Sequence, residues 1–123
     1  MLIMEYVLLA LKLIVAISLL NVWLIQYNKP TRWRGGDAKT IVEEFKVYGL
    51  PVWFCYVTGF LKVSLSLVLI ASYWFPAWEN PAALGIAILL LGSVVMHIKI
   101  SDPLYKSFPA FLFLVLCVAI YYL

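Results

Sequence analysis

The stretch from Pro51 to Phe75, PVWFCYVTGFLKVSLSLVLIASYWF, decides the fold, because it is almost entirely apolar and long enough to cross a lipid bilayer. At ~1.5 Å rise per residue, a helix of this length covers about 37 Å, which exceeds the ~30 Å hydrocarbon core of a bilayer. Lys62 is its one full charge and lies about halfway along it. A charge at that depth costs about 2.5–3.5 kcal/mol on insertion scales, so we expect the protein to compensate it or to use it.

The composition of the whole chain is that of an integral membrane protein. Of its 123 residues, 66% are hydrophobic and only 12% are charged, whereas soluble domains carry about 25% charged residues. We expect one all-α domain over residues 1–123, an integral membrane four-helix bundle with spans at about 2–25, 51–75, 82–98 and 108–123. We expect the first span to be retained, because it lacks the basic region and the cleavage site of a signal peptide.

A short amphipathic helix is predicted between the first two spans, over residues 37–48. Asp37 is a candidate N-cap, and Thr40 and Glu43 have the spacing of a capping box. Apolar side chains recur at helical spacing at Ile41, Val42, Phe45 and Tyr48. Charged side chains occupy the opposite face, so we expect this helix to lie in the membrane interface.

The positive charges predict the orientation of the chain. Of the nine Lys and Arg residues, five lie between the first and second spans and two between the third and fourth. The positive-inside rule places both of these connections in the cytoplasm and both termini outside. We therefore expect a multi-pass protein of the bacterial inner membrane, surrounded by membrane lipids and without a nucleic-acid partner.

A polar stripe on the second span is the first candidate for a binding site. Thr58, Lys62 and Ser66 follow at four-residue intervals, and Cys55 precedes Lys62 by two helical turns, so these side chains share one face. Lys12 is predicted at nearly the same depth on the first span. Two facing ammonium groups repel, so one must be neutral or an anion must lie between them. These five residues are therefore predicted to line a pocket for an anionic or carbonyl-bearing small molecule, or for a quinone headgroup.

A structural role for the same residues remains an alternative. Lys12 would then extend its amine to the membrane surface, pair with Glu5 through water, or face a helix of a partner protein. The two cysteines, Cys55 and Cys117, are expected to be inert packing residues, because apolar burial raises the pKa of a thiol.

A polar cluster is expected at the cytoplasmic end of the bundle, made of Arg32, Arg34, Glu43, Glu44, His97, Lys99 and Asp102. Its arginines either contact anionic lipid headgroups or pair with the carboxylates and close this end of the bundle. His97 either relays protons or hydrogen-bonds the basic loop or a lipid headgroup. We expect no metal site, because such sites normally need three or four protein ligands at regular spacing.

Glycines mark the places where helices are expected to approach closely. Gly59 lies on the second span, and Gly85 and Gly92 lie on one stripe of the third span. Small residues at such positions allow neighbouring backbones to come together in membranes.

Five motifs carry a resemblance to a known family. They are T-R-W-R-G-G-D-A at 31–38, E-E-F-K-V-Y-G-L-P at 43–51, G-F-L-K-V at 59–63, M-H-I-K-I-S-D-P at 96–103 and S-F-P-A-F at 107–111. With these motifs the chain resembles the DoxX-like family of small four-span membrane proteins, and Y-G-L-P and M-H are the most specific parts. Many relatives carry a glutamate where this chain has Lys62, so roles built on that acid do not transfer.

The resemblance implies a membrane protein associated with redox systems. The family takes its name from a subunit of a thiosulfate:quinone oxidoreductase, and other members are tied to complexes that handle oxidative or thiol stress. Its fold is similar to that of sterol isomerases and the sigma-two receptor, in which a ligand cavity opens between helices. Fold alone does not define function.

Two functions are consistent with these patterns. The first is an inner-membrane accessory protein with an intramembrane small-molecule pocket, associated with a quinone-linked redox complex and binding a quinone or a lipid. The second is a non-catalytic assembly factor or structural subunit, in which Gly85, Gly92 and helix 37–48 dock a larger membrane protein. We also expect a homodimer or a place in a larger complex. Catalysis by this chain alone is a third possibility, limited by a single histidine and no acid at mid-depth.

Overall fold

The protein is all-helical, as the sequence predicts, in a computed structural model that describes residues 2–27, 29 and 34–123. Four of its helical segments are long and apolar enough to cross a membrane. The long helices are α1 (Leu2–Leu20), α3 (Val52–Ala71), α4 (Glu79–Lys99) and α5 (Phe108–Tyr122). The short elements are α2 (Ile41–Val47), the π-helical η1 (Asn21–Ile25) that continues α1, and the 3₁₀ turns η2 (Pro76–Trp78) and η3 (Leu104–Ser107).

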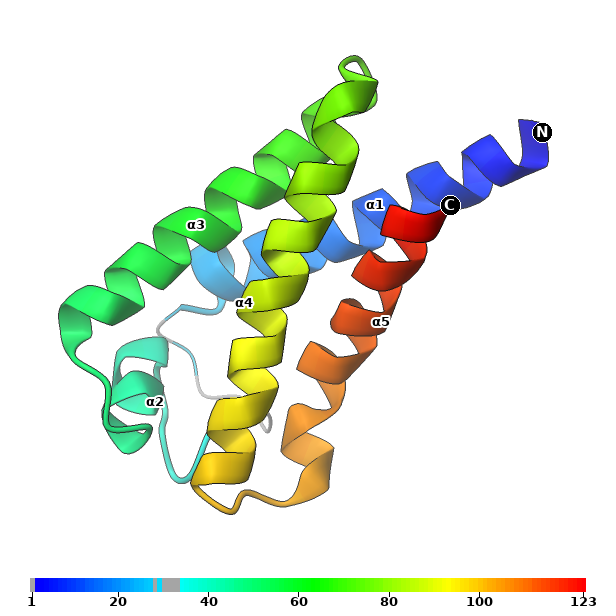
Figure 1. Ribbon diagram of the computed structural model, residues 1–123. Coiled ribbons are helices and arrows are strands. Elements are labelled where there is room, and N and C mark those ends of the chain that lie inside the picture. The colour runs from blue at the N-terminus through cyan, green and yellow to red at the C-terminus, as the bar shows by residue number, and fades with distance from the viewer. Residues whose placement is uncertain (1, 28, 30–33) are drawn as a thin grey trace.

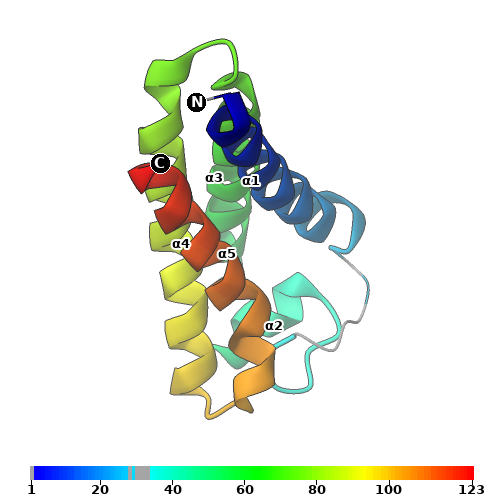
Figure 2. The ribbon, with the colours of Figure 1, turned by 90° about the vertical axis from the view of Figure 1, so that its right-hand side faces the viewer.

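The four long helices pack in a ring in which each helix contacts two neighbours. In order around the ring, α1 contacts α3, α3 contacts α4, α4 contacts α5, and α5 returns to α1. Figures 1 and 2 show the two chain ends at one end of this ring and α2 at the other, beside the start of α3. The connection between α1 and α3 therefore covers the end of the bundle that faces away from the termini.

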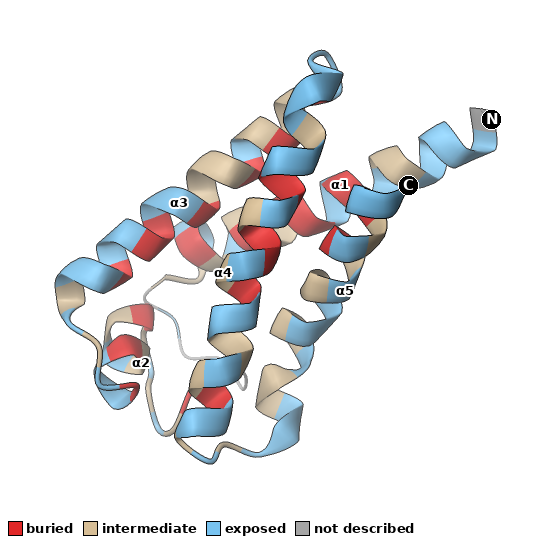
Figure 3. Ribbon diagram, viewed as in Figure 1, coloured by how far each residue is buried: buried red, intermediate tan, exposed pale blue. Residues whose placement is uncertain are grey.

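The interior contains two separate apolar clusters. The larger one joins all four long helices and includes Val15, Leu69, Ile86 and Ile120, which are fully buried. The smaller one lies at the α2 end and consists of Trp23, Ile41, Phe45 and Cys55. Many large apolar side chains point outward on the long helices instead, as Figure 3 shows by their exposed outer faces. Such an outer surface suits contact with lipid.

The short helix α2 is present, but it begins later than predicted. Its N-cap is Thr40, whose hydroxyl accepts the main-chain N–H of Glu43 while the Glu43 side chain returns to Thr40, so the predicted capping box is confirmed. The prediction of Asp37 as N-cap was wrong, because the extended backbone that a cap needs occurs at Thr40. Gly49, with φ of +82°, ends the helix and leads into α3.

Two span boundaries also differ from the prediction. Helix α3 ends at Ala71, before Phe75, because a turn follows it. Helix α4 begins at Glu79, before Ala82, although Pro81 lies near its start. Proline is tolerated in the first turn of a helix, where its missing N–H has no partner to lose. This earlier start brings the carboxylate of Glu79 into the bundle.

The three glycines predicted at helix contacts are not equivalent. A Cβ on Gly59 would lie 2.8 Å from the ring of Trp23, and a Cβ on Gly85 would lie 2.9 Å from Leu65, so both positions need glycine for close packing. Gly92 differs from the prediction, because a Cβ there would meet no atom within 4 Å. Gly92 instead borders a cavity of about 250 Å³.

Candidate functional site

Lys62 is the only charged side chain in the middle of α3, and the fold buries it. It is 6% exposed, and its Nζ donates a hydrogen bond of 3.2 Å to Ser93 Oγ on α4. The same Nζ lies 5.4 Å from the centre of the Trp23 ring, which is the geometry of a cation–π contact. Among the residues that the structure describes, no carboxylate lies within 4 Å of it. One hydroxyl takes only one of the three N–H donors of an ammonium group.

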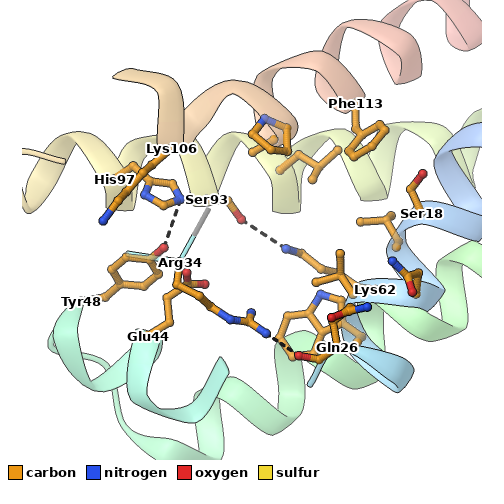
Figure 4. A pocket seen from close by; sticks show the side chains of 17 residues that line it. Ser18, Gln26, Arg34, Glu44, Tyr48, Lys62, Ser93, His97, Lys106 and Phe113 are labelled. Atoms are coloured by element: carbon orange, nitrogen blue, oxygen red, sulfur yellow. Dashed lines mark hydrogen bonds between the residues drawn. The ribbon is translucent and has the colours of Figure 1, made fainter. Parts of the chain in front are cut away.

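A cavity of about 480 Å³ opens next to Lys62, between the two apolar clusters. Its lining residues come from α1, η1, α2, α3, α4, η3 and α5 and include the loop residue Arg34. Figure 4 shows their side chains around the cavity. The apolar part of the wall is formed by Leu19, Val22, Trp23, Leu90, Pro109, Ala110 and Phe113. The polar part is formed by Ser18, Asn21, Gln26, Arg34, Glu44, Tyr48, Lys62, Ser93, His97 and Lys106. Small-molecule sites combine apolar surface with convergent polar groups in this way.

Arg34 contributes a second buried cation to this wall. It is 5% exposed, and its Nη2 donates to the main-chain oxygens of Gln26 at 2.6 Å and Lys29 at 3.2 Å. Its Nε is buried and has no hydrogen-bond partner among the residues that the structure describes. Burial lowers the pKa of Arg34, and the charge of Glu44 opposes this effect. The guanidinium group therefore fixes the end of η1 and keeps one donor unused.

The sequence predicted that the arginines either contact lipid headgroups or pair with carboxylates. Arg34 instead donates hydrogen bonds to main-chain oxygens. Glu44 accepts the main-chain N–H of Gly35 at 2.6 Å. Glu43 accepts the N–H groups of Lys39 and Thr40 and is exposed, so it is a capping residue rather than a member of the site. Arg32 lies outside the described residues.

Asp102 is the centre of a hydrogen-bonded network at the α2 end. Its Oδ2 lies 2.7 Å from His97 Nδ1, and its Oδ1 accepts the main-chain N–H of Gly36 at 3.0 Å and lies 3.8 Å from Lys106 Nζ. Burial alone raises the pKa of Asp102, but the hydrogen bonds from His97 and Gly36 and the charge of Lys106 outweigh it, so the net pKa is lowered. Asp102 is therefore held as a carboxylate.

The network continues from His97 to the wall of the cavity. His97 Nε2 lies 3.3 Å from the hydroxyl of Tyr48. When Nδ1 of the neutral imidazole donates to Asp102, Nε2 is left to accept from Tyr48. Burial and the charges of Glu44 and Asp102 raise the pKa of Tyr48, which keeps it a phenol. Lys99 joins this end by donating to the main-chain oxygen of Tyr48 at 3.0 Å.

Lys12 does not meet Lys62, contrary to the prediction of a shared pocket. Its Nζ lies 2.8 Å from Glu79 Oε1 at the start of α4 and 3.2 Å from Ser72 Oγ at the end of α3. Lys12 also pairs with Glu79 rather than with Glu5, and it is absent from the lining of the cavity. The physical reason is the early start of α4, which supplies a carboxylate at this depth.

The other residues of the predicted stripe have different surroundings. Ser66 is fully buried and donates to the main-chain oxygen of Lys62 at 2.7 Å, so its hydroxyl is used within its own helix. Thr58 borders the 250 Å³ cavity, which Lys62 and Arg34 also border. Cys55 borders a separate hollow of about 430 Å³ beside Tyr27. The structure therefore places Lys62 and Thr58 at one cavity, whereas Lys12, Ser66 and Cys55 line neither that cavity nor the 480 Å³ cavity.

Several residues of the cavity wall were missed by the sequence analysis, among them Tyr48, Ser93 and Trp23. Ser93 lies four residues before His97, and this helical spacing places both on one face of α4. That spacing was a usable signal. Tyr48 was assigned only to the apolar face of the short helix, and Trp23 was not assigned to the site. Among the described residues, no group of three or more His, Cys, Asp and Glu side chains is arranged to hold a metal ion.

Four apolar helices around a cavity with buried cationic side chains define the class of the protein: a multi-pass helical membrane protein with a polar interior site. Comparison with known families gives the same result as the motifs. The sequence model of the DoxX-like family matches residues 34–120, and the chain belongs to the DoxX-like family. The chain matches no curated protein. It also matches no solved structure.

Proposed function

We propose that this DoxX-like protein is a membrane-embedded binding protein whose central cavity takes a small amphipathic molecule. The observation that carries the proposal is the position of Lys62, buried at mid-span on the wall of a 480 Å³ cavity, with a hydroxyl and an aromatic ring as its contacts. A mid-membrane charge is costly and is usually retained for a function. A ligand oxygen would accept the N–H donors that Ser93 leaves unused.

The shape of the site suits a molecule with one polar end. Polar side chains from α2 and η3 line part of the cavity, and Phe113, Leu90 and Val22 supply apolar contacts. Quinones and lipids both have this two-part chemistry, and hydrogen bonds from Lys62 or Arg34 suit a quinone carbonyl. We further propose that the protein is an accessory subunit in the bacterial inner membrane and that it holds such a ligand for a quinone-linked redox complex.

Native mass spectrometry of the purified protein in nanodiscs tests this function. We expect a stoichiometric small-molecule adduct on the wild-type protein, or one-to-one binding of added decylubiquinone or of an amphiphile. Lys62→Met should reduce the adduct by about tenfold or more, since it removes a charged hydrogen-bond donor at the site. Lys46→Met is the matched control, because Lys46 is exposed on α2 and outside the cavity lining. A protein that binds no small molecule in any of these forms contradicts the proposal.

A further inference from the structure

The charges on the wall of the cavity identify the kind of ligand, on the assumption that the proposed binding function holds. Three cationic side chains, Arg34, Lys62 and Lys106, line the cavity, together with one carboxylate, Glu44. A fifth charged group, Asp102, is absent from the lining and lies beside Lys106. These five side chains carry three positive charges and two negative charges, so one positive charge is in excess, and among the described residues no carboxylate lies within 4 Å of Lys62.

Buried donors reinforce this excess of positive charge. Arg34 is nineteen-twentieths buried, and its buried Nε has no partner in the described part of the chain. Lys62 is almost equally buried, and Ser93 accepts only one of its three N–H groups. Both side chains border the 480 Å³ cavity and the adjoining 250 Å³ cavity, so a single ligand that fills this space can contact both. Buried donors and charges without partners carry a free-energy cost that a bound acceptor removes.

We propose that the ligand is an amphipathic monoanion, a carboxylate on an apolar body, with its carboxylate between Lys62 and Arg34. A single negative charge balances the single excess positive charge, whereas a phosphate dianion would leave a buried negative charge. Phe113, Leu90 and Val22 contact the apolar body. The combined volume of the two cavities is in the range of sites for small organic ligands, about 300–1,000 Å³.

Three probes of equal chain length separate charge from shape: decanoate, methyl decanoate and decylammonium. Each is titrated into wild-type protein in nanodiscs of zwitterionic lipid, and binding is read by native mass spectrometry. We expect decanoate to bind with one-to-one stoichiometry and at least about tenfold more tightly than the ester or the amine, since charge-assisted hydrogen bonds exceed neutral ones in strength. Lys62→Met and Arg34→Gln should each abolish most of this preference, and Lys46→Met should leave it unchanged.

The possible outcomes keep the two proposals apart. If methyl decanoate or decylubiquinone binds as tightly as decanoate, the cavity binds a neutral ligand; the binding function stands and the anion proposal is overturned. Tighter binding of decylammonium also overturns it, because Glu44 would then dominate the site. If no probe binds, both proposals fail. The comparison of decanoate with its ester needs no variant, so a substitution that prevents folding does not affect the test.

Discussion

Replacing each buried lysine by methionine should change stability in opposite directions. Lys12 Nζ has a carboxylate at 2.8 Å, from Glu79, and a hydroxyl at 3.2 Å, from Ser72. Lys62 has Ser93 and the Trp23 ring but no carboxylate among the described residues. The same substitution therefore breaks an ion pair at one position and removes an uncompensated charge at the other.

The magnitude at Lys12 follows from burial. Side-chain exposure is 9% for Lys12 and 17% for Glu79, so the pair is mostly but not fully withdrawn from solvent. Removing one partner of a fully buried pair costs about 3–5 kcal/mol, and the partial exposure of Glu79 reduces this for Lys12→Met to about 2–3 kcal/mol. In Lys12→Met/Glu79→Gln the stranded carboxylate is gone as well. The double variant should therefore recover at least about 1 kcal/mol relative to Lys12→Met.

Lys62→Met should leave the ligand-free protein as stable as the wild type or more stable by about 1 kcal/mol. Methionine is similar in length and flexible, so it fills the same space without a buried charge. Unfolding free energies are measured by steric trapping in neutral bicelles. Anionic detergent is avoided, because its headgroup would compete for the proposed site. Equal losses of unfolding free energy in Lys12→Met and Lys62→Met would refute this reasoning. So would a Lys12→Met/Glu79→Gln variant whose loss equals the sum of the losses of Lys12→Met and Glu79→Gln.

Two further predictions concern packing and pH. Gly59→Ala should destabilise the protein by about 1–3 kcal/mol, because its Cβ would lie 2.8 Å from the ring of Trp23. Gly92→Ala should be within about 0.5 kcal/mol of the wild type, because a Cβ there meets no atom within 4 Å. The same unfolding measurement compares the two variants, and equal losses of stability would contradict the packing argument. The pKa of Asp102 is lowered on folding, so its contribution to stability is fully present above its ordinary pKa of 3.8 and is lost as pH falls through the lower folded value. Between about pH 6 and pH 3, Asp102→Asn should therefore lose less stability than the wild type, and parallel pH profiles would contradict this assignment.

The sequence was sufficient to predict the four spans, the short helix and its capping box. Each depends on a local signal: continuous apolar stretches for the spans, and the Thr40–Glu43 spacing for the cap. The N-cap was misplaced at Asp37 because an aspartate before an apolar-periodic segment satisfies the same local rule. The backbone conformation at Thr40 decides between the two.

The residues that line the cavity were harder to predict, because two side chains on one helix face can make different hydrogen bonds. Ser66 shares the stripe of Lys62, yet its hydroxyl bonds the main chain of its own helix. Arg34 and Tyr48 reach the cavity only because the loop turns at Gly36, whose φ is +55°, and because Asp102 and Lys106 hold Gly36 from another part of the chain. Such long-range contacts leave no periodic signal in the sequence.

The different surroundings of the two lysines follow from their positions relative to the helix ends. Lys12 lies level with the start of α4, where a connection can place an acid inside the bundle and where the helix N-terminus favours a negative charge, so Glu79 fits there. Lys62 lies level with the middle of α4, where neighbouring positions are apolar except for Ser93. The carboxylate of Glu44 lines the same cavity, but within the described part of the chain no carboxylate lies within 4 Å of the Lys62 ammonium group. A ligand that enters the cavity can bring a closer counter-charge to Lys62, and this is the physical basis for the proposed site.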